Sequence, residues 1–323
     1  MTKRTRGLLL AGVGASFWGG SGAAAQYLFH DTPMTTTWLV AVRLLGAGLV
    51  LTLVSWLKNP GAVKGLVTQR WARWQLIAFA LFGTLNSQLT YFLAVRYSNA
   101  PTATVIQYLQ PIIIIAWVAL STRKWPRRID NLSVVLAVLG TFLLVTGGHL
   151  GTLTLTPLAL FWGLWCALAA ALYTLLPVKL LQHFDTFAVC GLAMLLGGLV
   201  MLPELLLRPV PHLSGGDWLL VAYVIFFGTM AAYTMFLGSL NFINPTAAGI
   251  LGAFEPLIAT VLAVTLLGTH LSSAMVVGSL LILATTFLQA IPIKRNPFIK
   301  FKHHKRMVKS GSSSTGTDEL LEE

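Results

Sequence analysis

Ten runs of about 20 apolar residues, the length that crosses the hydrocarbon core of a bilayer as a helix, follow one another along this chain. They lie near residues 7–29, 36–57, 75–95, 100–120, 131–147, 158–179, 187–207, 217–240, 246–267 and 273–291. Turn-forming residues separate them, for example Lys58-Asn59-Pro60-Gly61 and Asn99-Ala100-Pro101. We therefore predict an all-α integral membrane protein with ten transmembrane helices.

The composition supports a membrane location. Of the 323 residues, 56% are hydrophobic and 10% are charged, and the mean hydropathy is +0.76. A soluble domain carries about 25% charged residues. The net charge of +12 could suggest a nucleic-acid partner, but the basic residues lie between and after the apolar runs rather than on one face. No nucleic acid is expected, and the lipid bilayer is the expected environment.

The distribution of basic residues predicts the orientation. Short cytoplasmic loops retain Lys and Arg. If the N-terminus is cytoplasmic, Arg96 and Arg208 fall outside and Arg43 falls in the membrane, whereas the remaining 19 of the 22 Lys and Arg residues fall inside. This favours a multi-pass protein of the plasma (inner) membrane with both termini cytoplasmic. The tail 294–323, basic and then acidic, is expected to be a disordered cytoplasmic segment.

An internal repeat divides the spans. An offset of 145 residues aligns Gly83-Thr84 with Gly228-Thr229 and Gln110-Pro111 with Glu255-Pro256. Each half, 1–150 and 151–293, then holds five helices. Because five is odd, the second half enters the membrane from the opposite side, which predicts two inverted five-helix repeats with a substrate site between them.

Several stretches carry a family resemblance over about residues 7–291. They are Ala15-Ser16-Phe17-Trp18-Gly19, Arg43, the paired segments Tyr97 to Pro111 and Asn241 to Pro256, Leu266-Leu267-Gly268, and Leu271-Ser272. In these the chain resembles the EamA-like ten-helix branch of the drug/metabolite transporter superfamily. The resemblance implies export or exchange of small metabolites, commonly amino acids or amines, across the inner membrane.

Glu255 is the first candidate for the site. It is a carboxylate inside an apolar run and precedes Pro256, which has no N–H for the carbonyl four residues back. Ionisable groups in membrane helices tend to mark a substrate or proton pathway. The other interpretation is a protonated carboxyl group bonded to a neighbouring helix. We expect Glu255 to face a central cavity near Trp18 or Tyr91.

Polar residues in the matching helices are further candidates. Gln107 and Gln110 share a helix face at the repeat position of Glu255. Gln88 and Tyr91 form a stripe on the third helix, and Tyr233 is the repeat counterpart of Gln88. This stripe has two interpretations: its side chains contact a ligand, or they form hydrogen bonds between helices.

Aromatic residues and one arginine complete the predicted substrate-binding set. Trp18, Trp162 and Tyr173 would suit an aromatic wall that attracts an ammonium group, or else an interfacial belt. Arg43 would bind a substrate carboxylate, snorkel to headgroups or bond to freed backbone carbonyls; the latter two are favoured. The histidines that flank the spans show no metal-ligand spacing, so no metal or cofactor is expected.

We therefore expect a secondary transporter, more specifically an exporter, of small metabolites such as amino acids or amines, working by alternating access. Protons are a candidate coupling ion. The alternative is transport of quaternary amines or lipophilic cations, and a remote alternative is a membrane partner protein without transport. An enzyme is not expected, because the sequence has no H-E-x-x-H, no paired intramembrane Asp and no Ser with a membrane-buried His that could serve as base.

Overall fold

The computed structural model describes residues 2–123, 128–149, 155–239, 242–243, 248 and 251–289. These residues are largely helical and contain no strand. The predicted tail 294–323 and the predicted turn at Asn244-Pro245 lie outside them. The elements are α1 Lys3–Asp31, α2 Thr36–Lys58, α3 Pro60–Thr68, α4 Arg70–Ala78, η1 Phe79–Leu85 (π-helical), α5 Asn86–Tyr97, α6 Ala100–Gln107, α7 Gln110–Thr122, α8 Arg128–Thr146, α9 Pro157–Leu175, α10 Val178–His183, α11 Thr186–Val200, α12 Leu202–Leu207, α13 Gly215–Ile225, η2 Phe226–Ala231 (π-helical), α14 Ala232–Ser239, α16 Phe254–Leu267 and α17 Ser273–Gln289.

Within the described residues, seven helices are long and apolar enough to cross a membrane. They are Lys3–Asp31, Thr36–Lys58, Arg70–Tyr97, Ala100–Ser121, Arg128–Thr146, Pro157–His183 and Gly215–Phe236. The other three predicted spans correspond to shorter apolar helices, Thr186–Val200, Phe254–Leu267 and Ser273–Leu288. The prediction of an all-helical membrane fold is confirmed, and a membrane crossing by all ten runs stays a prediction.

Side-chain caps fix the starts of the helices at predicted turns. Asn59, between α2 and α3, accepts a hydrogen bond from the backbone N–H of Ala62 at 3.3 Å. Asn99 accepts from the N–H of Thr102 at 2.8 Å, at the start of α6. Both residues precede a helix with proline in its first turn, where the missing N–H costs nothing. The turn chemistry in the sequence therefore predicted these boundaries correctly.

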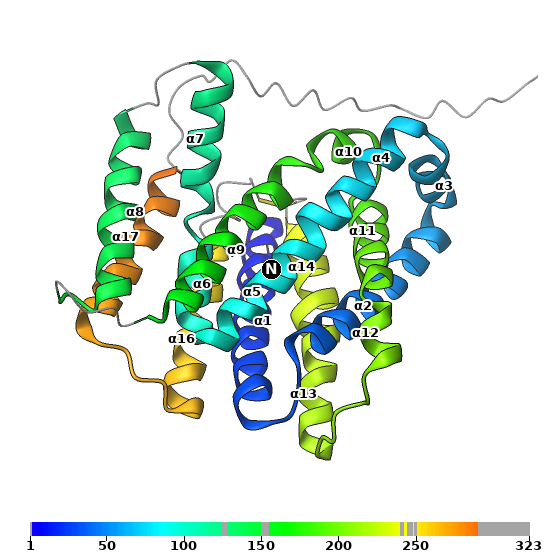
Figure 1. Cartoon of the computed structure of the whole chain (residues 1–323). Helices are drawn as coiled ribbons and strands as arrows, with labels where there is room; N and C mark the ends of the chain where they lie inside the picture. The colour runs from blue at the N-terminus through cyan, green and yellow to red at the C-terminus, as the bar shows by residue number, and fades with distance from the viewer. Residues whose placement is uncertain are drawn as a thin grey trace, which may run out of the picture. The chain divides into compact units, whose positions relative to one another are not determined.

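Small residues allow the closest helix contacts. Where α2 and α11 cross, Gly48 of α2 packs against Leu195 of α11. Reciprocally, Gly198 of α11 packs against Leu45 of α2. Helices α8 and α17 meet at Gly140 and Gly278, where a Cβ on either glycine would lie 2.6 Å from the carbonyl oxygen of the other. Figure 1 shows these two pairs on opposite sides of α1. The hydrophobic effect does not drive helices together inside a bilayer. Membrane helices therefore associate through van der Waals contacts, which small residues permit by letting the backbones approach closely.

Two π-helical segments interrupt long helices at corresponding places. Segment η1 contains Gly83-Thr84, and η2 contains Gly228-Thr229, the two pairs that the repeat aligns. A π-helical turn shifts the hydrogen-bond pattern of the backbone and often marks a functional site. The sequence predicted the repeat but gave no signal for the π-helical geometry.

Two further helices are broken before a proline. Residues Tyr108 and Leu109 separate α6 from α7, directly before Gln110-Pro111. Ala253 precedes α16, whose first turn contains Glu255-Pro256. A discontinuous helix leaves unpaired backbone groups, and in membrane proteins such groups occur where they line a cavity or contact other protein groups.

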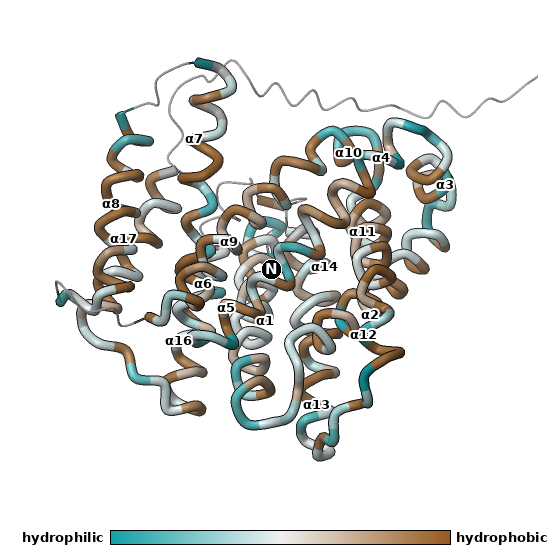
Figure 2. Tube along the Cα trace, viewed as in Figure 1, coloured by the Kyte–Doolittle hydropathy of each residue, from teal (hydrophilic) through white to brown (hydrophobic). Residues whose placement is uncertain are grey.

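Basic side chains on several helices pack against aromatic rings. The Lys179 Nζ lies 4.5 Å from the centre of the Trp71 ring, and the His183 ring packs edge-on against Trp71 at 5.3 Å. The Arg6 guanidinium lies over Phe242 at 5.2 Å. In Figure 1 helices α3, α4 and α10 lie at the top, and Figure 2 shows hydrophilic residues gathered there.

We expect Gly48→Ala to lower the free energy of unfolding by about 1 to 3 kcal/mol, because overpacking of a close contact costs that much. The added methyl group would lie 2.7 Å from the Leu195 Cα, part of the backbone of α11. Thermal unfolding of the purified protein in one detergent measures the change.

The matched control is Gly12→Ala. A Cβ on Gly12 meets nothing within 4 Å, so this variant should be neutral or slightly more stable. Equal melting temperatures for the two variants would contradict the packing described for α2 and α11.

Candidate functional site

One cavity of about 520 Å³ gathers polar and aromatic side chains from distant parts of the chain. Its lining residues come from α1, α2, α5, α6, α7, α9, α14, α16 and α17, with Tyr108 and Gly252 beside helix breaks. Nine of the ten predicted site residues line it: Trp18, Arg43, Gln88, Tyr91, Gln107, Gln110, Tyr173, Tyr233 and Glu255.

Trp162 is the predicted residue that does not line this cavity. It lies half-buried on α9, with its ring 5.0 Å from that of Phe161. Helical periodicity correctly put Trp162 and Tyr173 near one face of α9. However, 11 residues advance a helix by about 16 Å. The cavity reaches Tyr173 but does not extend that far along the helix.

Glu255 lies in the first turn of α16, at the break before Pro256. The Tyr108 hydroxyl donates a hydrogen bond to the Gly252 carbonyl at 2.7 Å and lies close to the Glu255 carboxylate. Gly252 is four residues before Pro256, so Tyr108 bonds the carbonyl that this proline leaves without a donor. The positive end of the α16 dipole also favours a carboxylate at this position.

Gln110 occupies the corresponding position in α7. Its amide nitrogen donates to the Thr174 hydroxyl on α9. The side-chain oxygen of Gln107, one turn earlier on α6, is buried and has no hydrogen-bond partner among the described residues. The cavity therefore presents neutral amides from one half of the chain and a carboxylate from the other.

Arg43 is 4% exposed and contacts the π-helical segment η2. Its Nε donates to the Thr229 hydroxyl at 2.6 Å, and its Nη2 donates to the Gly228 carbonyl at 3.1 Å. The guanidinium carbon also lies 5.0 Å from the centre of the Phe92 ring. Arg43 therefore bonds a backbone carbonyl of η2 and is buried at the cavity, and its binding of a substrate carboxylate stays a prediction.

Arg43 and Glu255 both line the cavity, but within the described part of the chain no ion pair joins their side chains within 4.0 Å. Charges withdrawn from water need compensation. A bound polar ligand or water between the two groups would supply it.

Aromatic rings form a continuous wall. The Trp18 ring lies 5.2 Å from that of Tyr233 and 5.0 Å from that of Phe236, between α1 and α14. The Tyr173 hydroxyl donates to the Tyr233 hydroxyl at 2.9 Å. Tyr91 shares a hydrogen bond of 3.0 Å with Thr104. Trp18 is therefore half-buried among these rings, where it lines the cavity.

The arginine contact has no counterpart in the other half. In the reciprocal contacts of α2 and α11, corresponding residues are 150 positions apart in the sequence. By this offset, Ala193 corresponds to Arg43. Thr229 accepts from Arg43, whereas the hydroxyl of Thr84, at the same place in η1, is buried and has no partner in the part of the chain that the structure describes.

Sequence reasoning missed several lining residues. They are Ser21, Ser87, Tyr108, Pro111, Ala170, Thr174, Phe236, Gly252 and Thr286. Ser21 and Phe236 each follow a predicted residue by three positions, so helical spacing would have found them. Tyr108 and Thr286 carried no comparable signal, because a helix break and a distant helix bring them to the cavity.

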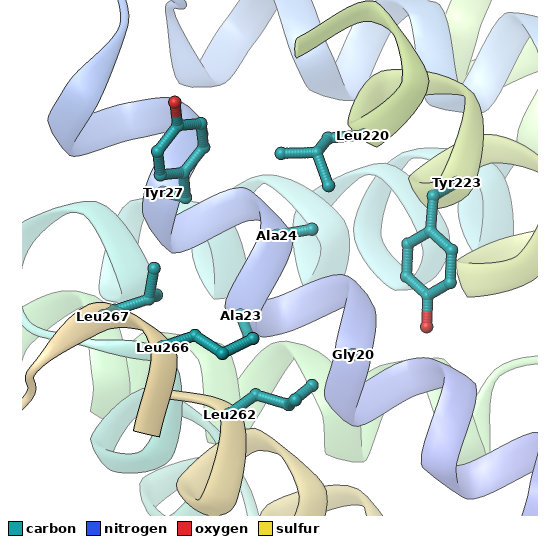
Figure 3. A pocket seen from close by; sticks show the side chains of 9 residues that line it. All are labelled: Gly20, Ala23, Ala24, Tyr27, Leu220, Tyr223, Leu262, Leu266 and Leu267. Atoms are coloured by element: carbon teal, nitrogen blue, oxygen red, sulfur yellow. The ribbon is translucent and has the colours of Figure 1, made fainter. Parts of the chain in front are cut away.

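A second cavity of about 430 Å³ lies between α1, α13 and α16 and contains no charged side chain. Figure 3 shows Gly20, Ala23, Ala24 and Tyr27 on α1, with the two other helices supplying leucines and Tyr223. None of the predicted site residues lies there. Within the described residues, no cluster of three or more His, Cys, Asp or Glu that could hold a metal ion occurs.

The fold and the cavity define an integral membrane protein whose helices surround a polar site. The model of the EamA-like transporter family matches the chain twice, over residues 5–146 and 157–290. The chain therefore belongs to the EamA-like transporter family.

Individual relatives agree with this assignment. The chain is 35% identical over 297 residues to the uncharacterized inner membrane transporter YicL of Salmonella typhimurium, covering 91% of this chain and 98% of that protein. It is 25% identical to the uncharacterized transporter YxxF of Bacillus subtilis, covering 90% and 89%. A protein crystal structure with 19% identity has the same fold, with a TM-score of 0.58 and coverage of 88% and 96%.

We expect Thr229→Val to lower the free energy of unfolding by about 1.5 to 3 kcal/mol, the cost of losing a hydrogen bond to a charged group. The variant keeps the volume of the side chain but leaves the Arg43 Nε without its acceptor. Thermal unfolding in detergent measures the loss.

Thr84→Val is the matched control. It removes a hydroxyl that is buried without a partner, so stability should stay unchanged or rise. If Thr84→Val destabilised as much as Thr229→Val, the contact with Arg43 would not be the cause.

Proposed function

We propose that this protein is a secondary transporter of small amine-bearing metabolites, such as amino acids, that works by alternating access. The observation that carries the proposal is the cavity in which Glu255 lies with an aromatic wall of Trp18, Tyr173 and Tyr233. Such a cavity offers a carboxylate and ring faces to an ammonium group and amides to its other end.

The proposed architecture is ten membrane-spanning helices in two inverted repeats, 1–150 and 151–293. Four observations support it: the family model matches twice, both halves contain a π-helical segment, both have a helix broken before a proline, and the glycine contacts of α2 with α11 are reciprocal. An inverted repeat supplies two similar halves that can open the cavity to either side in turn.

We place the protein in the plasma (inner) membrane with both termini cytoplasmic, because the basic loops then lie inside. The relative YicL is named as an inner membrane transporter. Export is the proposed direction, and protons that bind Glu255 are the proposed coupling ion.

The second candidate is transport of quaternary amines or lipophilic cations. It is favoured by the ring contacts of Trp18 with Tyr233 and Phe236, because ring faces bind ammonium groups without hydrogen bonds.

We expect amino acids to displace a bound ligand from the purified protein at lower concentrations than choline-like compounds do. The reverse order would favour the second candidate.

Glu255→Gln should reduce transport in proteoliposomes by tenfold or more, since it removes the carboxylate that the proposal assigns to substrate and proton. If Glu255 carries the proton, the pH dependence of transport should disappear in this variant. If it binds substrate only, substrate affinity should fall while the pH response remains.

The control is Glu204→Gln. Glu204 lies in α12, away from the cavity, where it pairs with Arg208 at 3.0 Å and accepts a hydrogen bond from Thr37 at 2.5 Å. This variant should transport at the wild-type rate. Unchanged transport in Glu255→Gln would refute the role given to Glu255.

A further inference from the structure

The side chain of Gln26 ties three separate segments together beyond the floor of the cavity. Its amide nitrogen donates to the Thr269 hydroxyl at 2.9 Å, and its oxygen accepts from the backbone N–H of Ala100 at 2.8 Å. Thr269 follows the end of α16, and Ala100 is the first residue of α6. Gln26 itself is 7% exposed on α1.

The ends of these helices show on which side of the cavity this contact lies. Gln26 is five residues, or about 7.5 Å along the helix, beyond Ser21, which lines the cavity. Ala100 precedes Gln107 on α6. Thr269 follows the C-terminal end of α16, whereas Glu255 lies in the first turn of that helix. All three segments therefore meet on the side where α1 ends, at the bottom of Figure 1.

Exposure of the lining residues increases in the opposite direction. Ser21, Arg43 and Tyr91 are 3%, 4% and 9% exposed, whereas Thr174, which accepts from Gln110, is exposed. The floor is also tightly packed: a Cβ on Gly22 would collide with the Tyr91 hydroxyl and lie 3.5 Å from the Ala100 Cβ. The cavity is therefore entered from the Gln110 and Thr174 side.

We propose that Gln26 is a gate residue: its two hydrogen bonds hold α1, α6 and the end of α16 together and keep the cavity closed on the side where α1 ends. This inference rests on the proposed transport by alternating access, which requires that side to open. Opening needs α1 to move from α6 or from Thr269, and either movement breaks at least one of the two bonds.

The two halves of the chain differ at this position. The offset of 155 residues that aligns Ala15-Ser16-Phe17-Trp18 with Ala170-Ala171-Leu172-Tyr173 places Leu181 at the position of Gln26. Leu181 is exposed and carries no hydrogen-bonding group. The hydrogen bonds of Gln26 therefore stabilise closure of the cavity on one side, and Leu181 forms no equivalent contact at the matching position. This difference favours the conformation seen here.

The test measures access to the cavity rather than transport. In protein whose two buried cysteines, Cys166 and Cys190, are replaced by alanine, a Ser21→Cys probe reports reaction with a membrane-impermeant thiol reagent. A Thr68→Cys probe, at the exposed last residue of α3, identifies the opposite side in each vesicle preparation. Labelling is compared from both sides with and without Gln26→Leu.

Gln26→Leu should raise labelling of the Ser21→Cys probe from the Gln26 side at least fivefold, because each lost hydrogen bond shifts a two-state equilibrium by roughly two- to tenfold. Thr269→Val removes one of the two bonds and should give a smaller rise. If Gln26→Leu fails to fold, Thr269→Val alone still tests the gate.

Gln75→Leu is the matched control. Gln75 donates to the Leu176 carbonyl at 2.8 Å between α4 and α9, so this variant also loses a hydrogen bond between helices, but at the other end. It should not raise labelling from the Gln26 side. Unchanged labelling in folded Gln26→Leu and Thr269→Val, or an equal rise in Gln75→Leu, would overturn the gate.

The outcome is separate from that of the transport assay. Loss of transport in every preparation would refute the proposed function, yet labelling would still show whether Gln26 controls access to the cavity. A rise in labelling without any transport would leave the gate standing and remove its proposed purpose.

Discussion

A backbone carbonyl inside a bilayer finds no water, so the protein itself must supply its donor. This requirement accounts for two of the contacts at the cavity. The carbonyl of Gly252, which Pro256 leaves without an N–H, accepts from Tyr108, and the carbonyl of Gly228, in a π-helical segment, accepts from Arg43. The irregular backbone and the polar side chains therefore occur at the same place because each compensates the other.

A regular framework surrounds this irregular centre. Glycines bring α2 close to α11 and α8 close to α17, and their contacts are reciprocal between the two parts of the chain. The polar groups do not follow that pattern: Glu255 corresponds to Gln110, and Arg43 corresponds to Ala193. The shared features hold the helices together, whereas the features that differ give the cavity its charge and its gate.

The site was predictable where a charge or an amide interrupts an apolar run. Glu255 and Arg43 were identifiable because ionisable groups in membrane helices are costly and rarely lack a role. Gln110 was identifiable because the repeat aligns it with Glu255. Trp162 lies outside the cavity, since helical periodicity predicts the face of a helix but not how far a cavity extends along it.

The sequence by itself determined that the chain is helical, that it lies in a membrane and which residues interrupt its apolar helices, because these properties depend on local composition and spacing. Only the tertiary structure decided that Tyr108 bonds Gly252, that Arg43 bonds the π-helical segment, and that Gln26 joins Ala100 to Thr269. Those pairs are separated by 144, 185 and up to 243 positions along the chain. The physical reason is that no local rule specifies a partner so distant, and helix packing alone brings these groups within hydrogen-bonding distance.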